Sequence, residues 1–130
     1  MPGFRSTAQW QRIRVAVLRR DGFICQICGA MLRSGRADKS GTVLRPAVVD
    51  HIAPYDWADV PHDAATAQAN LWAVCSDCDG QVIRSIEDVH RASGDWKSAR
   101  RDKLAFKVIG FDGRAQGPLH RPIDDMRYPT

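Results

Sequence analysis

The chain has 130 residues, and it lacks a membrane-spanning run, a secretory signal and, over one long stretch, any basic residue. No apolar run approaches the ~20 residues that a membrane-spanning helix needs. The first ten residues, MPGFRSTAQW, lack the apolar stretch and the small-residue cleavage site of a secretory signal. Residues 46–80 contain neither Lys nor Arg. The first two absences predict a cytoplasmic protein, and the length predicts one domain with a single core.

Charge is distributed unevenly along the chain. The segment without basic residues carries six Asp and a net charge of −6, whereas residues 1–45 carry +7 and residues 81–130 carry +3. Hard metal ions bind carboxylate oxygens, and polyanions need basic counter-charge. Fifteen of the 19 basic residues are Arg, whose planar group grips phosphate. The pattern is typical of a metal-dependent enzyme that acts on a polyanion, but a solvated surface with an acidic patch has the same composition.

The four cysteines occur as two C-x-x-C pairs, Cys25 with Cys28 and Cys75 with Cys78. Two such knuckles can supply four thiolates to one tetrahedral Zn²⁺, and four protein ligands leave no open position for a water molecule. Gly29 suits the tight turn that follows the first pair. Disulfides and a redox C-x-x-C are the alternatives, and a reducing cytoplasm disfavours the first. The spacing therefore favours a structural zinc site.

Periodicity and turn residues predict a mixed set of elements. Apolar spacing indicates a helix over residues 7–20, opened by a capping box at Ser6 and Gln9. A second helix is expected from Ser76, as its N-cap, to Gly94. The other expected elements are a short strand at 23–24, a polar loop at 34–42, a strand at 43–52, a loop at 53–70 and a short helix at 95–101. Four apolar residues should form the buried face of the second helix: Val82, Ile83, Ile86 and Val89.

Three motifs together resemble the HNH nuclease family. They are WQRIRVAVLRRDGFICQICG from Trp10, VDHI from Val49 and NLWAVCSDC from Asn70. The resemblance implies an α+β fold of the ββα-metal type, in which a hairpin and a helix hold a catalytic divalent ion. A structural zinc site on the four cysteines and a flanking N-terminal helix complete the implied fold. It also implies a nuclease domain over residues 1–110 and an extended basic tail over residues 111–130.

The resemblance assigns roles to individual residues. His51 would be the general base that removes a proton from the attacking water, and imidazole titrates near neutral pH as that task requires. Asp50 would ligate the catalytic ion. Asn70 would hold the loop, and through it the imidazole, by hydrogen bonds from its side chain to backbone groups; an ordinary turn Asn is the alternative. The remaining histidines, His62, His90 and His120, are expected to be hydrogen-bonded surface residues.

One position departs from the family pattern. Small HNH enzymes of this kind usually have His directly after the last cysteine, and Asp79 stands there in this chain. Two carboxylates, Asp50 and Asp79, would then hold the catalytic ion, and this oxygen shell favours Mg²⁺ or Mn²⁺ over Zn²⁺ or Ni²⁺. The alternative is that Asp79 merely favours a helix N-terminus in a protein that has lost catalysis.

The sequence thus predicts a metal-dependent DNA endonuclease of low sequence specificity that acts as a monomer and nicks DNA. A catalytically inactive zinc protein that binds DNA or assists its packaging is the second hypothesis, and a structural zinc protein with no nucleic-acid role is the third. The motif FDGRAQGPLHRP is similar to small phage and prophage HNH proteins, which implies a phage terminase or packaging partner and a bacterial or phage-infected cell. Six arginines are candidate phosphate contacts: Arg12, Arg19, Arg20, Arg84, Arg100 and Arg101. Three tryptophans are expected to pack rather than stack on bases: Trp57, Trp72 and Trp96.

Overall fold

The computed structural model describes residues 8–33, 44–61 and 67–107. In these residues the chain has an α+β fold, as the sequence predicts, with a three-stranded sheet and helices. Several sequence-based expectations lie outside the described residues: Ser6, the loop at 34–42, His62, His120, the boundary after residue 110 and the tail at 111–130. None of the helices in the described ranges is both long and apolar enough to cross a membrane.

The sheet is built on an antiparallel pair of strands. Strand β2 (Arg45–His51) pairs with β3 (Leu71–Cys75), so that Asp50 lies opposite Trp72 and His51 lies opposite Leu71. A two-residue strand, β1 (Leu32–Arg33), pairs in parallel with the start of β2, and the order is β1-β2-β3. The strand expected at 43–52 is confirmed, and Pro46 stands near its start, where a missing N–H is tolerated.

Strand β3 was not among the elements expected from periodicity. All five of its side chains are buried, so it lacks the alternation that marks a half-exposed strand. Its outer backbone edge is covered as well. The Ala73 amide donates to the Asp21 carboxylate at 2.9 Å, and the Ala73 carbonyl accepts from the Gln26 amide at 2.9 Å. These bonds satisfy an edge that would otherwise be open to another strand.

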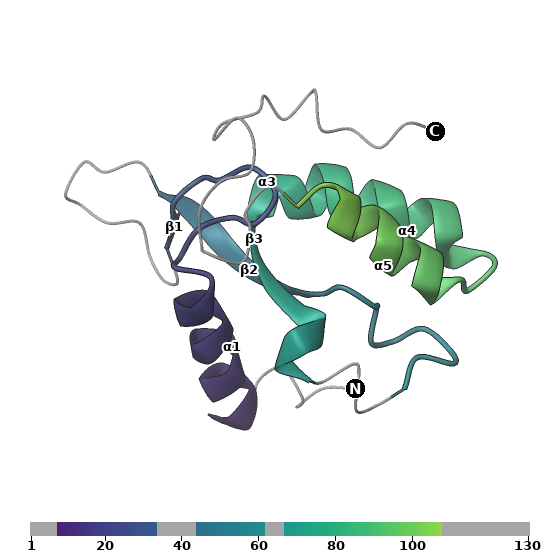
Figure 1. Ribbon diagram of the computed structural model, residues 1–130, viewed down its shortest axis with the longest axis horizontal. Coiled ribbons are helices and arrows are strands. Elements are labelled where there is room, and N and C mark those ends of the chain that lie inside the picture. The colour runs from purple at the N-terminus through teal and green to yellow at the C-terminus, as the bar shows by residue number, and fades with distance from the viewer. Residues whose placement is uncertain (1–7, 34–43, 62–66, 108–130) are drawn as a thin grey trace.

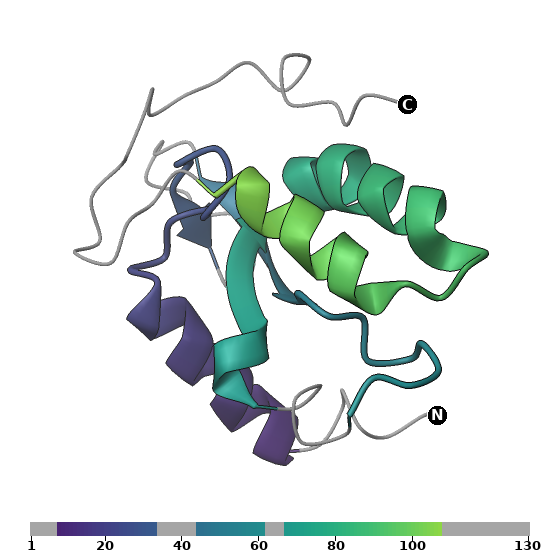
Figure 2. The ribbon, with the colours of Figure 1, turned by 45° about the vertical axis from the view of Figure 1, so that its right-hand side comes forward.

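Helices cover the sheet from two sides. Helix α1 (Ala8–Arg20) packs on β2 and β3. On the other side, a continuous helical segment starts directly after β3 and consists of α3 (Ser76–Cys78), the π-helical η2 (Asp79–Ile83) and α4 (Arg84–Arg91). Helix α5 (Trp96–Ala105) returns beside α4, and a short 3₁₀ turn, η1 (Gln68–Asn70), precedes β3. Figures 1 and 2 both show the strands between α1 and the α4–α5 pair.

The structure corrects the predicted start and face of the second helix. Its N-cap is Cys75 rather than Ser76, because the Cys75 sulfur accepts a hydrogen bond from the Cys78 amide. Val89 is 45 % exposed, whereas Ile86 is fully buried. Val89 lies three residues beyond Ile86 within the same helix α4, but helical spacing alone does not place its side chain in the core.

Two further boundaries differ from the prediction. Phe23 has a positive φ of 54°, and Ile24 makes only an isolated bridge to Met31, so residues 23–24 form a turn instead of a strand. The helix expected at 95–101 begins as predicted, with Asp95 as its N-cap, but continues to Ala105. Beyond the predicted end, Lys103 of α5 bonds to Glu87 of α4, which ties this last part of the helix to the fold.

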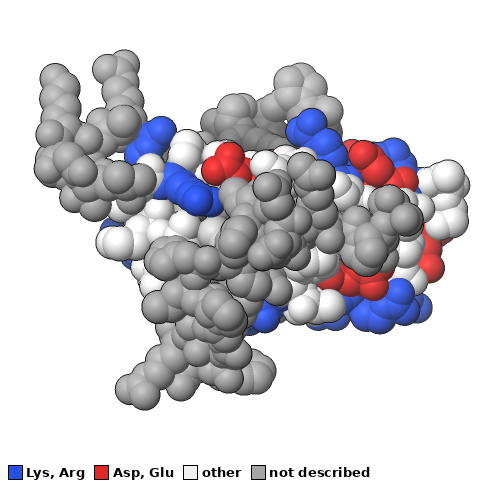
Figure 3. Space-filling model, turned by 90° about the horizontal axis from the view of Figure 1, so that it is seen from above, with Lys and Arg blue, Asp and Glu red and all other residues white. Residues whose placement is uncertain are grey.

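The core lies between α1, the sheet and the α3–α5 segment. Val17 and Leu18 of α1 are fully buried, as are Val82 and Ile86 on the opposite side of the sheet. Trp72 and Trp57 are buried, and Trp96 packs against the same cluster, in agreement with their expected packing role. Figure 3 shows basic and acidic side chains interleaved over the end of the molecule formed by α4 and α5. In the described part of that face neither sign forms a continuous band.

Substitution of Ile86 tests the corrected face of the helix. Ile86→Ala should lower the free energy of unfolding by about 2–5 kcal/mol, because it removes a buried side chain and leaves a cavity. Val89→Ala, in the same helix, should change it by less than about 0.5 kcal/mol, because that side chain is largely in water. Denaturant unfolding of the two variants measures the difference, and similar losses in both would contradict the assignment.

Candidate functional site

The four cysteines form one buried cluster. Their sulfur atoms all lie within 4.8 Å of one another, and no disulfide joins them. In a regular ZnS₄ tetrahedron with bonds of about 2.3 Å, neighbouring sulfurs are about 3.8 Å apart. The Sγ atoms of Cys28 and Cys75 are 3.8 Å apart. The cluster therefore has the size and chemistry of a structural zinc site, and the residues fit that metal.

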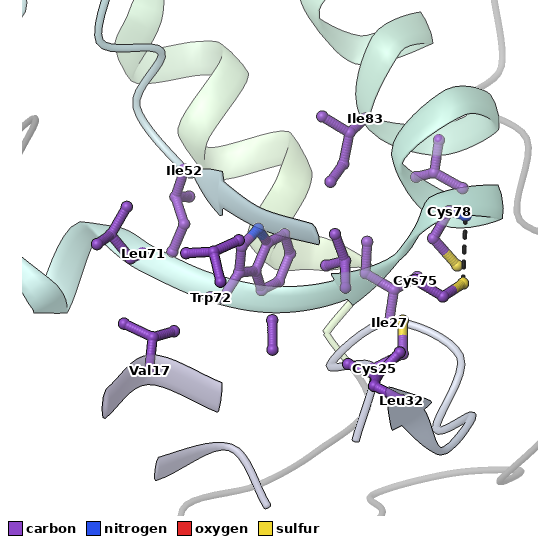
Figure 4. Packing of buried hydrophobic residues seen from close by; sticks show 14 of the residues in the cluster. Val17, Cys25, Ile27, Leu32, Ile52, Leu71, Trp72, Cys75, Cys78 and Ile83 are labelled. Carbon is purple, nitrogen blue, oxygen red and sulfur yellow. Dashed lines mark hydrogen bonds between the residues drawn. The ribbon is translucent and has the colours of Figure 1, made fainter. Parts of the chain in front are cut away.

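The backbone around the cluster is shaped to bring the two knuckles together. Gly29 has a φ of +80°, which lets the chain turn directly after Cys28 as the sequence suggests. Cys75 ends β3 and caps α3, so the second knuckle is the junction between strand and helix. Figure 4 shows Cys75 and Cys78 at this junction, with Cys25 approaching from the first knuckle.

Positive charge and thiol hydrogen bonds favour the thiolate at Cys28 and Cys75, whereas hydrogen bonds within the cluster raise the pKa of Cys25 and Cys78. The Arg45 guanidinium lies 3.7 Å from the Cys75 sulfur and 4.0 Å from the Cys28 sulfur. Hydrogen bonds with the neighbouring thiols hold the pKa of Cys75 below its usual range, and the bond with Cys25 has the largest effect. A hydrogen bond with Cys25 also lowers the pKa of Cys28 to about 7. Arg45 also pairs with Asp77 at 3.5 Å, which fixes it beside the sulfurs.

A second feature is a pocket of about 430 Å³ where β2 ends beside the helical segment. It has a polar lining that includes Asp50 and His51 from β2 and Asp79 from η2. Asp50 and His51 are consecutive in a strand, where side chains ordinarily point to opposite faces. The pocket reaches both of them because it lies at the strand end, where the chain leaves the sheet. The pocket thus brings together Asp50, His51 and Asp79, whereas Asn70, the fourth residue of the predicted site, does not line it.

His51 is buried and packs against two aromatic rings. Its side chain is only 3 % exposed. The imidazole stacks on Trp10 of α1, with ring centroids 5.6 Å apart and an angle of 11° between the planes. Tyr55 lies on it at 4.8 Å with a tilt of 44°. The two rings fix the plane of the imidazole at the wall of the pocket.

Asn70 joins the start of β3 to the loop that follows His51. Its side-chain oxygen accepts from the Ala53 amide at 2.9 Å, and its side-chain nitrogen donates to the Ala53 carbonyl at 3.1 Å. The Ile52 amide also donates to the Asn70 carbonyl at 2.8 Å. The chain directly after the imidazole is therefore fixed to the neighbouring strand, which is the geometry that a positioning role for Asn70 requires. The catalytic part of that role stays a prediction.

Asp50 is a buried carboxylate with two hydrogen-bond donors. Its Oδ2 atom accepts from Trp72 Nε1 at 3.0 Å and from Lys103 Nζ at 3.1 Å. Burial raises the pKa of Asp50 to about 6, although the Lys103 charge and the Trp72 hydrogen bond act in the opposite direction. The Oδ1 atom accepts no hydrogen bond from the described residues. One oxygen of Asp50 thus remains to ligate a cation.

Asp79 begins the π-helical stretch η2 and is half-buried. Short π-helical segments are frequent at functional sites, because the wider turn redirects side chains. Asp79 and Arg84, at the two ends of this stretch, both line the pocket. Two carboxylates in a polar pocket are a hard-oxygen donor set that fits Mg²⁺ or Mn²⁺ with water completing the shell. Among the described residues, the four cysteines are the one group of three or more metal-ligating side chains whose ligand atoms all lie within 4.8 Å of one another.

The six candidate DNA-binding arginines do not lie together. Arg84 is exposed on α4 at the pocket, whereas Arg12 and Arg19 line a shallow depression on α1. The Arg20 guanidinium binds to the protein backbone, because it donates to the Gln68 and Leu71 carbonyls at 2.7 and 2.5 Å. Arg100 and Arg101 are exposed on α5, where Arg101 pairs with Asp102 at 3.1 Å.

Sequence reasoning missed three residues around the pocket. Lys103 is fully buried and bonds to Asp50 and to Glu87, and Arg91 lies over the Trp57 ring at 5.6 Å while also lining the pocket. A signal for Lys103 existed in its spacing. It follows Ala99 by four residues and therefore falls on the buried face of α5, where a lysine requires a partner.

Substitution of one cysteine tests the metal cluster. Cys78→Ser should remove the bound zinc, measured by elemental analysis of the purified chain. It should also lower the free energy of unfolding by at least about 3 kcal/mol, since binding energy at such sites is folding energy. Ser76→Ala is the matched control: Ser76 is exposed and does not cap the helix, so zinc and stability should be kept. A Cys78→Ser protein with a full complement of zinc would contradict the site.

Three comparisons with known proteins complete the description of the site. No family model, curated protein or solved structure matches the chain. The resemblance to HNH nucleases therefore rests on the sequence motifs, and the case for a catalytic pocket rests on the side chains that line it.

Proposed function

We propose that the protein is a metal-dependent endonuclease of the HNH type, which hydrolyses phosphodiester bonds in DNA. The observation that carries this proposal is the meeting of His51, Asp50 and Asp79 in one polar pocket. These side chains come from the end of one strand and from the helix that follows its partner strand. A base and two hard-oxygen ligands in one pocket are the parts that metal-assisted hydrolysis needs.

The arrangement of elements supports the proposal. Two antiparallel strands, β2 and β3, lead directly into the helical segment, and the four cysteines hold the loop before them against the strand–helix junction. This order of hairpin, helix and cysteine cluster is the one that the family resemblance implies. Asn70 also bonds to the loop after His51, as the proposed positioning role needs.

Each pocket residue has a proposed task. His51, which packs against Trp10 and Tyr55, takes the proton from the water that attacks phosphorus. Asp50 and Asp79 would hold the Mg²⁺ or Mn²⁺ ion, which would supply charge stabilisation at the scissile phosphate. Arg84 at the pocket places a positive charge where the DNA backbone would lie. DNA is the proposed partner, and a role in phage DNA packaging rests on the resemblance.

A nicking assay tests the proposal. The full chain, incubated with supercoiled plasmid and Mg²⁺ or Mn²⁺, should convert it to the relaxed form. His51→Ala should lower the rate by at least about a hundredfold, because the proton acceptor is lost. Asp79→Ala should raise the metal concentration needed for half-maximal rate.

The matched control is His90→Ala, which removes a histidine that bonds to Asp102 at 2.7 Å and does not line the pocket. It should nick DNA at close to the rate of the unsubstituted chain. If no metal supports nicking while zinc content and DNA binding are intact, the protein is a non-catalytic DNA-binding module. Equal rates for His51→Ala and the unsubstituted chain would also defeat the proposal.

A pair of charge substitutions tests which face meets DNA. Arg84→Ala should weaken DNA binding and reduce the slope of log affinity against log salt by about one, because one phosphate contact is lost. Lys97→Ala removes the same charge from an exposed α5 residue that does not line the pocket, and it should change the slope less. Salt titrations of binding to a short duplex measure both, and equal effects would contradict docking at the pocket.

A further inference from the structure

A lysine ammonium occupies a cage of oxygen atoms at the candidate site. The Lys103 side chain is 0 % exposed. Its Nζ atom donates to Glu87 Oε2 at 2.6 Å, to the His51 carbonyl at 2.9 Å and to Asp50 Oδ2 at 3.1 Å. Three acceptors match the three hydrogens of an ammonium group, so its hydrogen-bonding capacity is filled. Helix α5 thus supplies a cation that bonds to both β2 and α4.

This cation separates two carboxylates that belong to the lining of the same pocket. The Asp50 and Glu87 side chains are 11 % and 19 % exposed, and each has an oxygen bonded to the same nitrogen. Without the ammonium, two poorly solvated negative charges would lie close together and repel each other. Arg91 also approaches Glu87, but at 3.7 Å and from the exposed side, so it is the weaker counter-charge.

The oxygens that Lys103 holds are the type that a hard divalent cation selects. Two carboxylate oxygens and a backbone carbonyl are typical ligands of such ions. While the ammonium is in place, Glu87 Oε2 and Asp50 Oδ2 are both engaged by it. The ligands proposed for the ion are Oδ1 of Asp50 and the carboxylate of Asp79, and water would fill most of the shell of an ion held by them. Asp56 and Asp88 also line the pocket.

We propose that Lys103 is a built-in cation that withholds Glu87 and one oxygen of Asp50 from divalent metal and thereby keeps the pocket a weak, water-rich metal site. This inference rests on the proposed function in taking the pocket as the metal site. Its content is separate, because it concerns how tightly the pocket holds an ion and not whether the ion is used in catalysis. Weak binding keeps ligand positions on the ion open for water and for phosphate oxygens.

Direct Mn²⁺ binding tests the inference without any DNA. Electron paramagnetic resonance of free Mn²⁺, titrated into the zinc-loaded full chain, gives the affinity for each variant. Lys103→Met should bind Mn²⁺ at least about tenfold more tightly, because a neutral side chain frees two carboxylates and removes a repelling charge. Lys103→Met combined with Glu87→Gln should lose most of that gain, since Glu87 is one of the freed ligands.

Glu87→Gln alone is the matched control, and it keeps the ammonium in place. It should change Mn²⁺ affinity by less than about threefold, because Glu87 is not available as a ligand while Lys103 holds it. The Glu87→Gln variant also tests the inference if Lys103→Met fails to fold. A tenfold or larger loss of Mn²⁺ affinity in Glu87→Gln would show that Glu87 is already a ligand and would overturn the inference. So would unchanged or weaker binding in folded Lys103→Met.

The two proposals can fail separately. If the cycle of variants behaves as expected but the unsubstituted chain never nicks plasmid, the inference about Lys103 stands and the nuclease proposal fails. If the chain nicks plasmid and His51→Ala does not, but Lys103→Met binds Mn²⁺ no more tightly than the unsubstituted chain, the nuclease proposal stands and the inference fails.

Discussion

The gathering of four cysteine thiols at one point is the constraint on which the rest of the structure depends. Cys25 and Cys28 lie in the loop after α1, whereas Cys75 and Cys78 lie where β3 becomes α3. Because Cys75 is both the last residue of the strand and the cap of the helix, the cluster fixes the angle between them. Strand β2 is paired to β3 in a defined register, so its end at Asp50 and His51 is fixed relative to the helix. Paired strands and a continuous helical segment thus connect the cysteine cluster to the pocket.

The pocket combines this rigidity with an unusual concentration of charge. Its acidic residues lie in or near a segment of sequence without Lys or Arg. The ammonium group that pairs with Asp50 and Glu87 belongs to Lys103 of α5, which lies later in the chain. The net charge of +4 gives no hint of such local balance. A carboxylate in this setting is partly desolvated, so whether it is paired with an ammonium or with a metal ion decides what the site can do. The electrostatics of the pocket are therefore set by tertiary packing.

The sequence predicted the parts of the site that depend on local spacing. The two C-x-x-C pairs predicted the cysteine cluster, and the strand ending in Asp50 and His51 was predicted nearly to its boundaries. Strand β3 was missed because burial on both faces removes alternation. The exposure of Val89 was missed because helical spacing marks an apolar stripe but does not show how far along the helix that stripe is covered. The spacing of Lys103 after Ala99 indicates that its side chain is buried, but local pattern could not identify its partners Asp50 and Glu87, which are 53 and 16 residues away. Contacts over such separations are set by how the elements pack.

Anomalous X-ray diffraction from crystals of the full chain grown with Mn²⁺ tests the central claim most directly. Data collected at the zinc and manganese absorption edges locate each metal independently. We expect zinc at the centre of the four cysteine sulfurs and manganese in the pocket, in contact with Asp50 Oδ1 and the Asp79 carboxylate. A pocket that contains no manganese at saturating concentration, or manganese bound only away from Asp50 and Asp79, would contradict that claim.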